Sequence, residues 1–457
     1  MARGGERTIV VGGGIAGLTA AHDLAEAGAD VLLLEADGQP GGKLRTGEVA
    51  GVGVDVGAEA MLYRHAQGRA LAEQLGLPLV HPTSASSRIW TRGELRRLPR
   101  SLMGAPVDLD DLAASGVLSD EGLARARAQV VPQLAEGEDA SVGDLVAARF
   151  GDEVVDRLVE PLLGGVYAGH ARRISVRAAV PQLADLVTRE HFTLPTPTLQ
   201  AGGPQPVFAT VDGGMGRLPV ALDAALRDRP GVEIRYGTRV VGLGRDGDGF
   251  VVTTEPGGQE RGARVVVATP APPTARLLGE LAPVAAAELA ALDYASVVVV
   301  TFAFRADDPG VAEALEVGAA GFLVPPVDGR RIKASTFSFA KWDWVRKAGD
   351  GLLFLRTSLG RLGEEATVQV PDEQLVAASL ADLAEATGLT AVPVDAVVQR
   401  WGGGLPQLTV GHPDRVARIR AAVAAVPGLS VCGAVYDGVG IPATIGSAHR
   451  AVEEVLA

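Results

Sequence analysis

Residues 8–46 contain, in order, a short apolar strand, a glycine-dense turn, a helix, a second apolar strand that ends in an acidic residue, and a Gly-Gly-Lys sequence. The first strand, TIVV at 8–11, is β-branched throughout, which is typical of a strand buried on both faces of a parallel sheet. Gly12, Gly14 and Gly17 then follow the G-x-G-x-x-G spacing. The first glycine permits a tight turn, the second lets the backbone approach a pyrophosphate, and the third lets the helix pack closely on the strand. The segment therefore predicts a dinucleotide-binding cradle, because a glycine-rich turn formed for structural reasons alone does not require these neighbouring parts.

The remainder of this segment supplies the other contacts that a bound dinucleotide needs. Residues 18–27 are good helix formers, Gly28 ends the helix, and the second buried strand at 31–34 delivers Glu35 to the ribose hydroxyls. Free N–H groups at the start of the helix meet the phosphates. These features fit NAD and FAD alike. The Gly-Gly-Lys sequence at 41–43 favours FAD, because it places flexible backbone and one cation where a longer cofactor continues past its pyrophosphate.

The composition limits the partners and the cellular setting. The chain has 457 residues, 47% of them apolar, and a formal net charge of −13, so we expect a large buried core, two or three domains and no nucleic-acid partner. Its single cysteine, Cys432, excludes an intramolecular disulfide and fits a reducing compartment. The first strand begins by Thr8, which leaves no room for a signal peptide, and the longest apolar run, 297–304, is too short to span a bilayer. We expect a cytoplasmic protein with at most peripheral membrane contact.

The order of the predicted elements indicates an α/β protein (α+β overall) with discontinuous domains. Helical periodicity dominates residues 109–163, whereas strands separated by Asp-Gly and proline turns resume at Val232. We expect a Rossmann-like FAD-binding domain, a helical insertion that forms part of the pocket or faces a membrane, and a strand-rich substrate-binding domain. The expected bounds are 1–82, 210–276 and 396–457 for the first, 83–183 for the second, and 184–209 and 277–395 for the third.

Near the C-terminus, residues 438–442 (GVGIP) lead into a helix, and Pro442 suits its first turn because the missing N–H costs nothing there. The positive N-terminal end of this helix would stabilise an anionic reduced flavin if it pointed at the N1/C2 edge of the isoalloxazine ring. The plainer alternative is a capped terminal helix without a ligand. The two glycines favour the flavin interpretation, because they let the backbone lie against a planar ring.

Five separated segments give the chain a resemblance to a known family over nearly its whole length. They are the cradle at 8–46, VDVGAEAML at 54–62, LLGGVYAGHARRISVRAAVPQL at 162–183, VDGGMGRLPVAL at 211–222, and GAVYDGVGIP at 433–442 with its helix. On these residues the chain resembles the oxygen-dependent coproporphyrinogen III and protoporphyrinogen oxidases of the amine oxidase clan. The segment at 162–183 discriminates best, because the wider clan does not carry it.

The resemblance implies an FAD cofactor held by residues from both ends of the chain. Carried over position by position, the flavin contacts fall on Gly12, Gly13, Gly14, Ile15, Ala16, Gly17, Glu35, Ala36, Lys43, Gly57, Ala58, Glu59, Ala60, Val240, Trp401, Val439, Gly440 and Ile441. Val240 and Trp401 have packing as a plainer alternative. Lys333 and Lys341 invite comparison with the lysine that the clan places near flavin N5.

The reaction that the resemblance implies is the oxidation of a porphyrinogen to a porphyrin, with FAD taking hydride from carbon and returning electrons to dioxygen as hydrogen peroxide. Such a step depends on holding the substrate edge-on to the flavin in a dry pocket. We therefore assign no side chain as a catalytic acid or base. The seven histidines are scattered without metal-ligand spacing, so no metal site is predicted.

The same resemblance indicates where the substrate binds. The arginine-rich segment at 86–100 is typical of a hairpin, and Arg88 falls where the family often places an arginine that pairs with a propionate. The plainer alternative is that Arg88 lies on a solvent-exposed face of the strand. Tyr167, Gly169 and Tyr294 are candidate pocket walls, with structural packing as their alternative.

We predict coproporphyrinogen III as the substrate, in bacterial haem biosynthesis, because the chain resembles the Gram-positive branch of the family. Protoporphyrinogen IX oxidation is the first alternative. An amine or polyamine oxidase and a carotenoid desaturase of the same clan are others. A non-catalytic porphyrin or flavin carrier is an alternative from a different class, and turnover-linked peroxide would separate it from an enzyme. The predicted partners are the porphyrinogen, dioxygen and a downstream haem-pathway enzyme.

Overall fold

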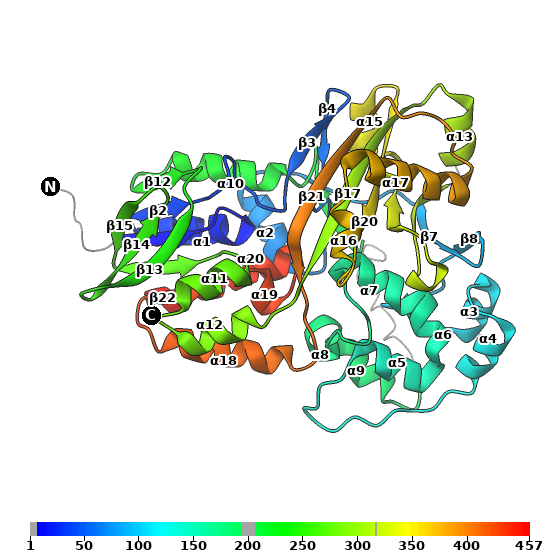
Figure 1. The fold of residues 1–457 in the computed structure, drawn as a ribbon, viewed down its shortest axis with the longest axis horizontal. Coiled ribbons are helices and arrows are strands. Elements are labelled where there is room, and N and C mark those ends of the chain that lie inside the picture. Colours follow the sequence, from blue (N-terminus) through cyan, green and yellow to red (C-terminus); the bar gives the residue numbers. More distant parts are fainter. Residues whose placement is uncertain (1–6, 193–205, 316–317) are drawn as a thin grey trace.

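The computed structural model describes residues 7–192, 206–315 and 318–457 and contains a five-stranded parallel sheet at one end of the molecule (Figure 1). Its strand order is β12-β2-β1-β16-β22, with every neighbouring pair parallel. These strands are β1 (Thr8–Val11), β2 (Val31–Leu34), β12 (Val232–Arg235), β16 (Arg264–Val267) and β22 (Leu429–Val431). β1 and β2 are buried along their whole length, as expected for apolar strands covered on both faces. The predicted α/β class with a Rossmann-like sheet assembled from separated stretches is confirmed.

Helices and a small meander cover the two faces of the parallel sheet. One face packs against four helices, which are α1 (Ile15–Glu26), α2 (Ala66–Gln74), α10 (Arg217–Arg227) and α20 (Ile441–Leu456). The other face packs against β13 (Val240–Asp246), β14 (Gly249–Thr254) and β15 (Gly258–Gly262) and against α11 (Ala271–Leu278), α12 (Pro283–Ala290), α18 (His412–Ala424) and α19 (Ala434–Asp437). Helices α1 and α20 come from opposite ends of the chain and pack against each other.

The second large sheet has seven strands in the order β21-β17-β20-β19-β18-β7-β8 and is antiparallel except between β18 and β7. These strands are β7 (Ser86–Thr91), β8 (Glu94–Arg97), β17 (Tyr294–Arg305), β18 (Ala319–Leu323), β19 (Ile332–Thr336), β20 (Leu352–Leu359) and β21 (Asp395–Pro406). One face is covered by an apolar core that includes α13 (Pro309–Leu315) and α17 (Asp372–Thr387). Short helices lie between the strands at η2 (Pro326–Asp328), α14 (Ser338–Lys341), α15 (Asp343–Gly349) and α16 (Glu365–Val368).

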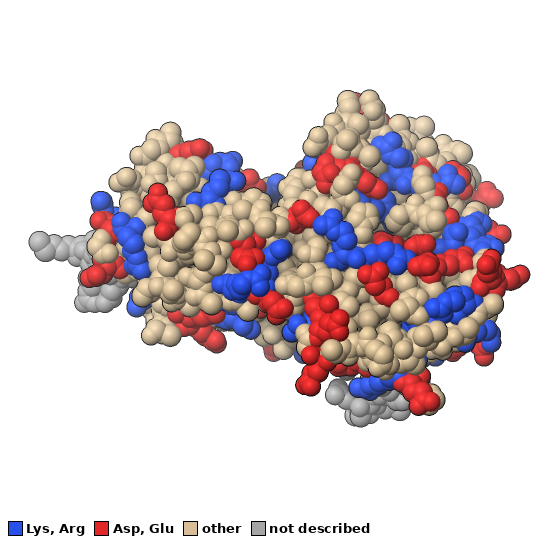
Figure 2. Space-filling view, turned by 60° about the horizontal axis from the view of Figure 1, so that its bottom comes forward, with Lys and Arg blue, Asp and Glu red and all other residues tan. Residues whose placement is uncertain are grey.

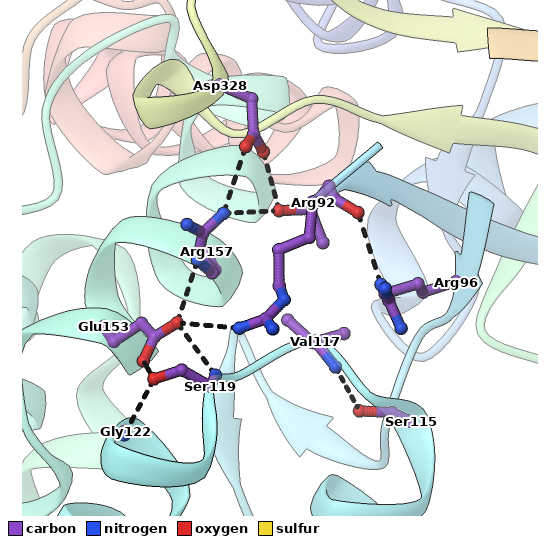
Figure 3. Close-up of polar contacts among 10 residues, drawn as sticks. Arg92, Arg96, Ser115, Val117, Ser119, Gly122, Glu153, Arg157 and Asp328 are labelled. Carbon is purple, nitrogen blue, oxygen red and sulfur yellow. Dashed lines mark hydrogen bonds and ion pairs between the residues drawn. The ribbon is translucent and has the colours of Figure 1, made fainter. Parts of the chain in front are cut away.

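The helical part forms a separate core below this sheet (Figure 1). It consists of α3 (Leu109–Ser115), α4 (Asp120–Arg127), α5 (Val142–Phe150), α6 (Asp152–Val154), a π-helical turn η1 (Val155–Val159), α7 (Glu160–Tyr167), α8 (Val176–Ala179) and α9 (Pro181–Val187). Side chains of this part also join it to the seven-stranded sheet. Arg157 of η1 donates to Glu153 at 3.0 Å and to Asp328 of η2 at 3.1 Å, and Ser119 donates to Glu153 at 2.6 Å (Figure 3). Thr91 of β7 donates to Asp328 at 2.6 Å, so one polar network connects three segments.

The remaining strands form small sheets. They are the hairpin β3 (Thr46–Val49) with β4 (Val52–Asp55), the set β5 (Met61–Leu62), β11 (Phe208–Val211) and β6 (Leu79–Val80), and the pair β9 (Ser101–Leu102) with β10 (Ala105–Pro106). Three parts of the chain pack outside the domains that their positions predict. The hairpin of β7 and β8 lies within 83–183, yet β7 pairs with β18, and α12 lies within 277–395, yet it packs with the parallel sheet. Nearly all of β21 lies within 396–457, yet it pairs with β17 of the seven-stranded sheet. The domain bounds stay a prediction, and residues 193–205 of the segment 184–209 lie outside the described residues.

Charged side chains of both signs are intermingled on the face of the molecule shown in Figure 2. Among the described residues, no helix has the length and apolar character that crossing a bilayer requires.

Candidate active site

A cavity of about 660 Å³ lies at the carboxyl ends of the parallel strands. The residues that follow β1, β2 and β16 all line it, which is where ligands bind in open α/β sheets. Gly12 adopts φ +107°, and an added Cβ at Gly17 would lie 1.8 Å from the carbonyl oxygen of Gly12. An added Cβ at Gly14 would meet no atom within 4 Å. The first and third glycines therefore serve the turn and the close packing of α1, whereas Gly14 leaves open space beside the cavity, as an elongated dinucleotide requires.

Glu35 is held at the edge of this cavity by backbone donors. One carboxylate oxygen accepts the N–H of Asp37 at 2.7 Å, and the other accepts the N–H of Gly13 in the glycine turn. The side chain is half-buried and lines the cavity. The acidic residue is therefore fixed directly beside the glycine turn, where ribose hydroxyls would meet it.

Two helices begin at the cavity wall, and neither has a side-chain cap. Gly14 is the N-cap of α1 and Gly440 is the N-cap of α20, so the first N–H groups of both helices have no capping side chain. Ile15 and Ile441, the first helical residues, line the cavity. Each helix directs the positive end of its dipole at the cavity, which suits a phosphate at α1 and an electron-rich ring edge at α20.

Lys43 lies between this cavity and a second one. Burial lowers the pKa of Lys43, and a neighbouring phosphate would restore the preference for its charged form. Its carbonyl oxygen accepts the N–H of Ala58 at 3.0 Å, and an added Cβ at Gly57 would lie 2.0 Å from the same oxygen. The close contact joins the Gly-Gly-Lys turn to the segment that begins at Gly57.

The second cavity, of about 520 Å³, adjoins the first, because Lys43, Ala58 and Leu405 line both. Its walls come from β17, β18, β19 and β20 on one side and from α7 on the other. Apolar residues and glycines make up most of the lining. Its charged residues are Lys43, Lys333, Lys341, Arg356 and a single carboxylate, Glu59. The second cavity is therefore apolar with an excess of cationic groups, which suits an anionic substrate with an apolar body.

Glu59 is the centre of an ion-pair cluster in this second cavity. The Lys341 ammonium lies 2.6 Å from one carboxylate oxygen, and the Arg356 guanidinium lies 3.1 Å from the other and also donates to the carbonyl of Gly57 at 2.8 Å. Burial alone would raise the pKa of Glu59, but Arg356 and Lys341 lower it to about 2. The cluster fixes the segment from Gly57 to Ala60, which contributes to the walls of both cavities.

The structure brings together nearly all of the flavin contacts predicted from the sequence. The first cavity is lined by Gly12, Gly14, Ile15, Ala16, Glu35, Ala36, Lys43, Ala58, Val240, Val439 and Ile441. The second is lined by Lys43, Gly57, Ala58, Glu59, Ala60 and Trp401. Gly13, Gly17 and Gly440 line neither cavity and belong to the turns and helix starts around the first. The individual roles of these residues stay predictions.

The four residues predicted to bind substrate are more scattered. Tyr294 lines the first cavity rather than the second, and its hydroxyl accepts the N–H of Ala271 at 2.8 Å. Tyr167 is buried in the core of the helical part, and an added Cβ at Gly169 would lie 2.0 Å from the side-chain oxygen of Gln407. Neither Tyr167 nor Gly169 lines the two cavities.

Arg88 also lines neither cavity, although its neighbour Ser87 lines the second. Side chains alternate along a strand, so Arg88 shares a face of β7 with Trp90, which packs against Phe322 in the apolar core. The alternation explains how an arginine one position away from the cavity can be directed elsewhere. A role for Arg88 in binding a propionate stays a prediction.

From the sequence, Lys333 of β19 and Lys341 of α14 were compared only with the lysine near flavin N5, and Arg356 of β20 was not singled out. One signal does mark the lysines, because the chain has only four lysines and three of these, Lys43, Lys333 and Lys341, line the second cavity. Arg356 carries no comparable signal, since arginine is abundant throughout the chain. Among the described residues, no group of three or more histidine, cysteine, aspartate or glutamate side chains is placed to hold a metal ion.

The model of a family described as flavin-containing amine oxidoreductase matches residues 15–456. The chain belongs to this flavin-containing amine oxidoreductase family. One relative is a Mycobacterium tuberculosis H37Rv protein named coproporphyrinogen III oxidase. It is 38% identical to this chain, and the match covers 98% of this chain and 96% of the relative. A Bacillus subtilis protein of the same name is 29% identical, with 100% of this chain and 99% of the relative covered.

A solved structure from Exiguobacterium sp. 255-15, described as a candidate protoporphyrinogen oxidase, matches this flavin-containing amine oxidoreductase with a TM-score of 0.85. It is 29% identical, and the match covers 100% of both chains. The resemblance to porphyrinogen oxidases and the prediction of an FAD-dependent oxidoreductase are thereby confirmed.

Proposed function

We propose that this flavin-containing amine oxidoreductase oxidises coproporphyrinogen III to coproporphyrin III, with dioxygen as the electron acceptor and hydrogen peroxide as the second product, in haem biosynthesis. The observation that carries the proposal is the second cavity, which lies directly beside the first. Its largely apolar lining contains four cationic side chains and one carboxylate. The full-length identity to proteins named coproporphyrinogen III oxidase supports the same substrate.

The lining of the second cavity matches the chemistry of a porphyrinogen. The macrocycle is an apolar body, which would pack against side chains such as Val297, Val299 and Leu323. Its propionates are carboxylates, which require cationic partners when they leave water. Lys341 and Arg356 are already neutralised in part by Glu59, and Lys43 would meet the phosphates of the dinucleotide, whereas Lys333 has no carboxylate partner among the described residues. The cavity therefore retains positive charge for an anionic substrate.

The chain's own contribution is binding, orientation and exclusion of water. The glycine turn, Glu35 and Lys43 would hold the dinucleotide, while the N-terminal end of α20 would meet the ring. When bound, FAD supplies the acceptor for the hydride that leaves carbon and passes electrons on to dioxygen. The second cavity would hold the macrocycle beside the segment 57–60, so that the reacting carbon is positioned rather than activated by an acid or a base.

The proposal is tested by aerobic turnover of the flavin-loaded protein with coproporphyrinogen III and with protoporphyrinogen IX, measured as porphyrin fluorescence and peroxide release. We expect faster oxidation of coproporphyrinogen III, as kcat/KM, and peroxide in proportion to porphyrin. A clear preference for protoporphyrinogen IX would overturn the substrate. Porphyrin binding without any peroxide would support a carrier, and turnover of putrescine or another amine would support an amine oxidase instead.

A cytoplasmic setting, suggested by the single cysteine, belongs to the same proposal, as does a downstream haem-pathway enzyme that accepts the product. The product has a large apolar macrocycle, which makes such a recipient chemically reasonable. Co-purification of the flavoprotein with a porphyrin-metalating enzyme, retained after the porphyrin product is removed, would support the partner.

A further inference from the structure

Lys333 is a buried lysine in the wall of the second cavity. It lies in β19 at a register shift, where Ile332 pairs with Leu359 and the next paired residue is Ala334. Ile332 packs into the apolar core on the far side of the sheet, whereas Lys333 lines the cavity. Only 3% of its surface is exposed. Because side chains alternate along a strand, Lys333, which follows the core-facing Ile332, places a long cationic side chain on the cavity side of the sheet.

The Lys333 ammonium has no hydrogen-bond or ion-pair partner among the described residues, since no carboxylate of that part of the chain comes within 4.0 Å of it. A second buried cation, Arg361, lies in the same region, because it donates to the carbonyl of Val324 at 3.2 Å and the N–H of Val324 donates to the carbonyl of Lys333 at 2.9 Å. Glu364 lies 3.7 Å from Arg361 and acts on Lys333 only at longer range. The charge of Glu160 acts to raise the pKa of Arg361, and one of the Glu160 oxygens accepts the N–H of Ala171 at 2.9 Å.

Two neighbouring buried cations are unfavourable unless an anion joins them. Burial, and then the charge of Arg361, lower the pKa of Lys333 to about 7. A carboxylate that entered the cavity would favour the ammonium form and offset the cost of burying it. Lys341, another lysine of this cavity, differs from Lys333 because it already has the Glu59 carboxylate as its partner at 2.6 Å. Lys333 is thus the cavity cation on the sheet side whose partner is still to be supplied.

We propose that Lys333 binds a carboxylate of the substrate, with Arg361 behind it reinforcing the positive potential of the cavity wall. The inference rests on the proposed function and names the residue that recognises the anionic part of the porphyrinogen. Acceptance of a pyrrole proton by a neutral Lys333 is the competing role for this amine. Arg361 opposes that role, because protonation without an incoming anion would create two adjacent buried cations.

The test compares Lys333→Met with Lys347→Met, a matched change at an exposed lysine outside both cavities. Each flavin-loaded variant is assayed with coproporphyrinogen III and with its tetramethyl ester, which keeps the macrocycle but has no free carboxylate. For the acid, we expect Lys333→Met to raise KM by about tenfold to a hundredfold with a much smaller change in kcat, as for loss of a charge-assisted contact. For the ester, Lys333→Met and Lys347→Met should be equivalent to the wild type.

The pH dependence separates a carboxylate contact from a packing role. In the wild type, kcat/KM for the acid should fall as the pH rises above about 7, because the free enzyme loses the Lys333 proton. Lys333→Arg should move this fall to higher pH, because a guanidinium stays charged. The ester should show no such fall in either protein. A fall that is identical in the wild type and in Lys333→Arg would contradict the assignment.

The outcomes distinguish this inference from the proposed function. If the wild type oxidises coproporphyrinogen III and Lys333→Met has an unchanged KM for it, the carboxylate role is wrong and the proposed function stands. If kcat for the ester falls together with kcat for the acid, Lys333 takes part in the reaction step instead. If the wild type oxidises no porphyrinogen, the proposed function fails, and fluorescence titration with coproporphyrin III and its ester then tests the carboxylate contact alone. If Lys333→Met fails to fold, the KM of Lys333→Gln for the acid and the pH profile of Lys333→Arg test the carboxylate role instead.

Discussion

The two adjoining cavities are built by different means. The first is shaped largely by backbone, because the glycine turn, the starts of α1 and α20 and the ends of the parallel strands form its walls. The second is shaped by side chains on β17 to β20 and on α7, and its character depends on a few charges in an apolar wall. Backbone constraints leave a spaced glycine pattern in the sequence, whereas the partners of a side-chain cluster can lie hundreds of residues apart. Glu59 and Arg356, which form an ion pair, are an example.

The largest effect is expected in the backbone-built cavity from Gly17→Val. The added Cβ would lie 1.8 Å from the Gly12 carbonyl oxygen, so α1 would have to move away from β1. We expect loss of stable flavin binding and a decrease of about 3 kcal/mol or more in the free energy of unfolding. Denaturant unfolding and the flavin absorbance per polypeptide would measure the two effects.

Gly14→Ala is the matched control for this change. Its φ of −69° is accessible to alanine, and the added methyl meets no protein atom within 4 Å. The free energy of unfolding of the flavin-free protein should therefore stay within about 0.5 kcal/mol of the wild type. Flavin affinity should nevertheless fall, because the methyl enters the space that a pyrophosphate would occupy. Equal loss of stability in the two variants would show that the glycines serve the fold alone.

The next effect concerns the side-chain cavity and the variant Glu59→Gln. Removing the carboxylate leaves Lys341 and Arg356 without their shared partner, and breaking a buried ion pair from one side typically costs about 3 kcal/mol or more. The pKa of Glu59 is lowered to about 2, so its contribution is present above its ordinary value of 4.5 and is lost as the pH falls toward 2. Denaturant unfolding at pH 7.5 and at pH 3 would follow this loss.

Glu48→Gln, at an exposed position of β3, controls for the loss of one negative charge. It should leave the free energy of unfolding nearly unchanged at both pH values. If Glu59→Gln were as stable as Glu48→Gln at pH 7.5, the cluster would not hold the segment at 57–60, and the side-chain account of the second cavity would be wrong.

The sequence predicted the backbone-built cavity well because its constraints are local. The turn at Gly12, the acidic end of β2 at Glu35 and the start of α20 at Gly440 each appear within a few residues of the elements that they serve. The second cavity was predicted less completely. The strand register decides which face of the sheet a residue such as Arg88 lies on. That register depends on the pairing of β7 with β18, which joins segments more than two hundred residues apart. The lysine at the register shift in β19 could not be placed without the pairing of β19 with β20.

A smaller effect is expected where the helical part meets the seven-stranded sheet. Arg157→Met removes the donor that connects Glu153 to Asp328, and the side chains of all three residues are less than a quarter exposed. We expect a loss of about 1 to 3 kcal/mol in the free energy of unfolding, because two partly buried carboxylates lose a charged donor. Porphyrinogen KM should rise as well, since α7 follows η1 directly and lines the second cavity.

A double-mutant cycle with Asp328→Asn tests whether this contact is the cause. The two residues are 3.1 Å apart, so their effects on stability should be less than additive, with a coupling of about 0.5 kcal/mol or more. Arg127→Met, which removes an exposed arginine paired with Asp110 in the same part of the molecule, should have little effect. Fully additive effects of Arg157→Met and Asp328→Asn would show that the helical part is held by its apolar core alone.

The smallest effect is expected from His449 on α20, which lies 2.5 Å from Asp23 on α1 beneath the backbone-built cavity. The hydrogen bond with Asp23 raises the pKa of His449, and the same contact contributes to lowering the pKa of Asp23. The pair therefore stabilises the fold most between pH 3.8, the ordinary pKa of the aspartate, and pH 6.5, the ordinary pKa of the histidine. Its contribution is lost as the pH rises through the raised pKa of His449. Because the His449 side chain is 41% exposed, we expect only about 0.5 kcal/mol.

His449→Gln keeps a polar side chain but cannot carry the charge, so it isolates this titration. Denaturant unfolding at pH 5.5 should show the wild type to be more stable than His449→Gln, and the difference should vanish at pH 9. Flavin content should be the same in both proteins at both pH values, because the N-terminal end of α20 that faces the first cavity is held by backbone contacts. Flavin loss that follows the titration of His449 would instead mean that a side-chain ion pair positions this helix, and the division between a backbone-built and a side-chain-built cavity would no longer hold.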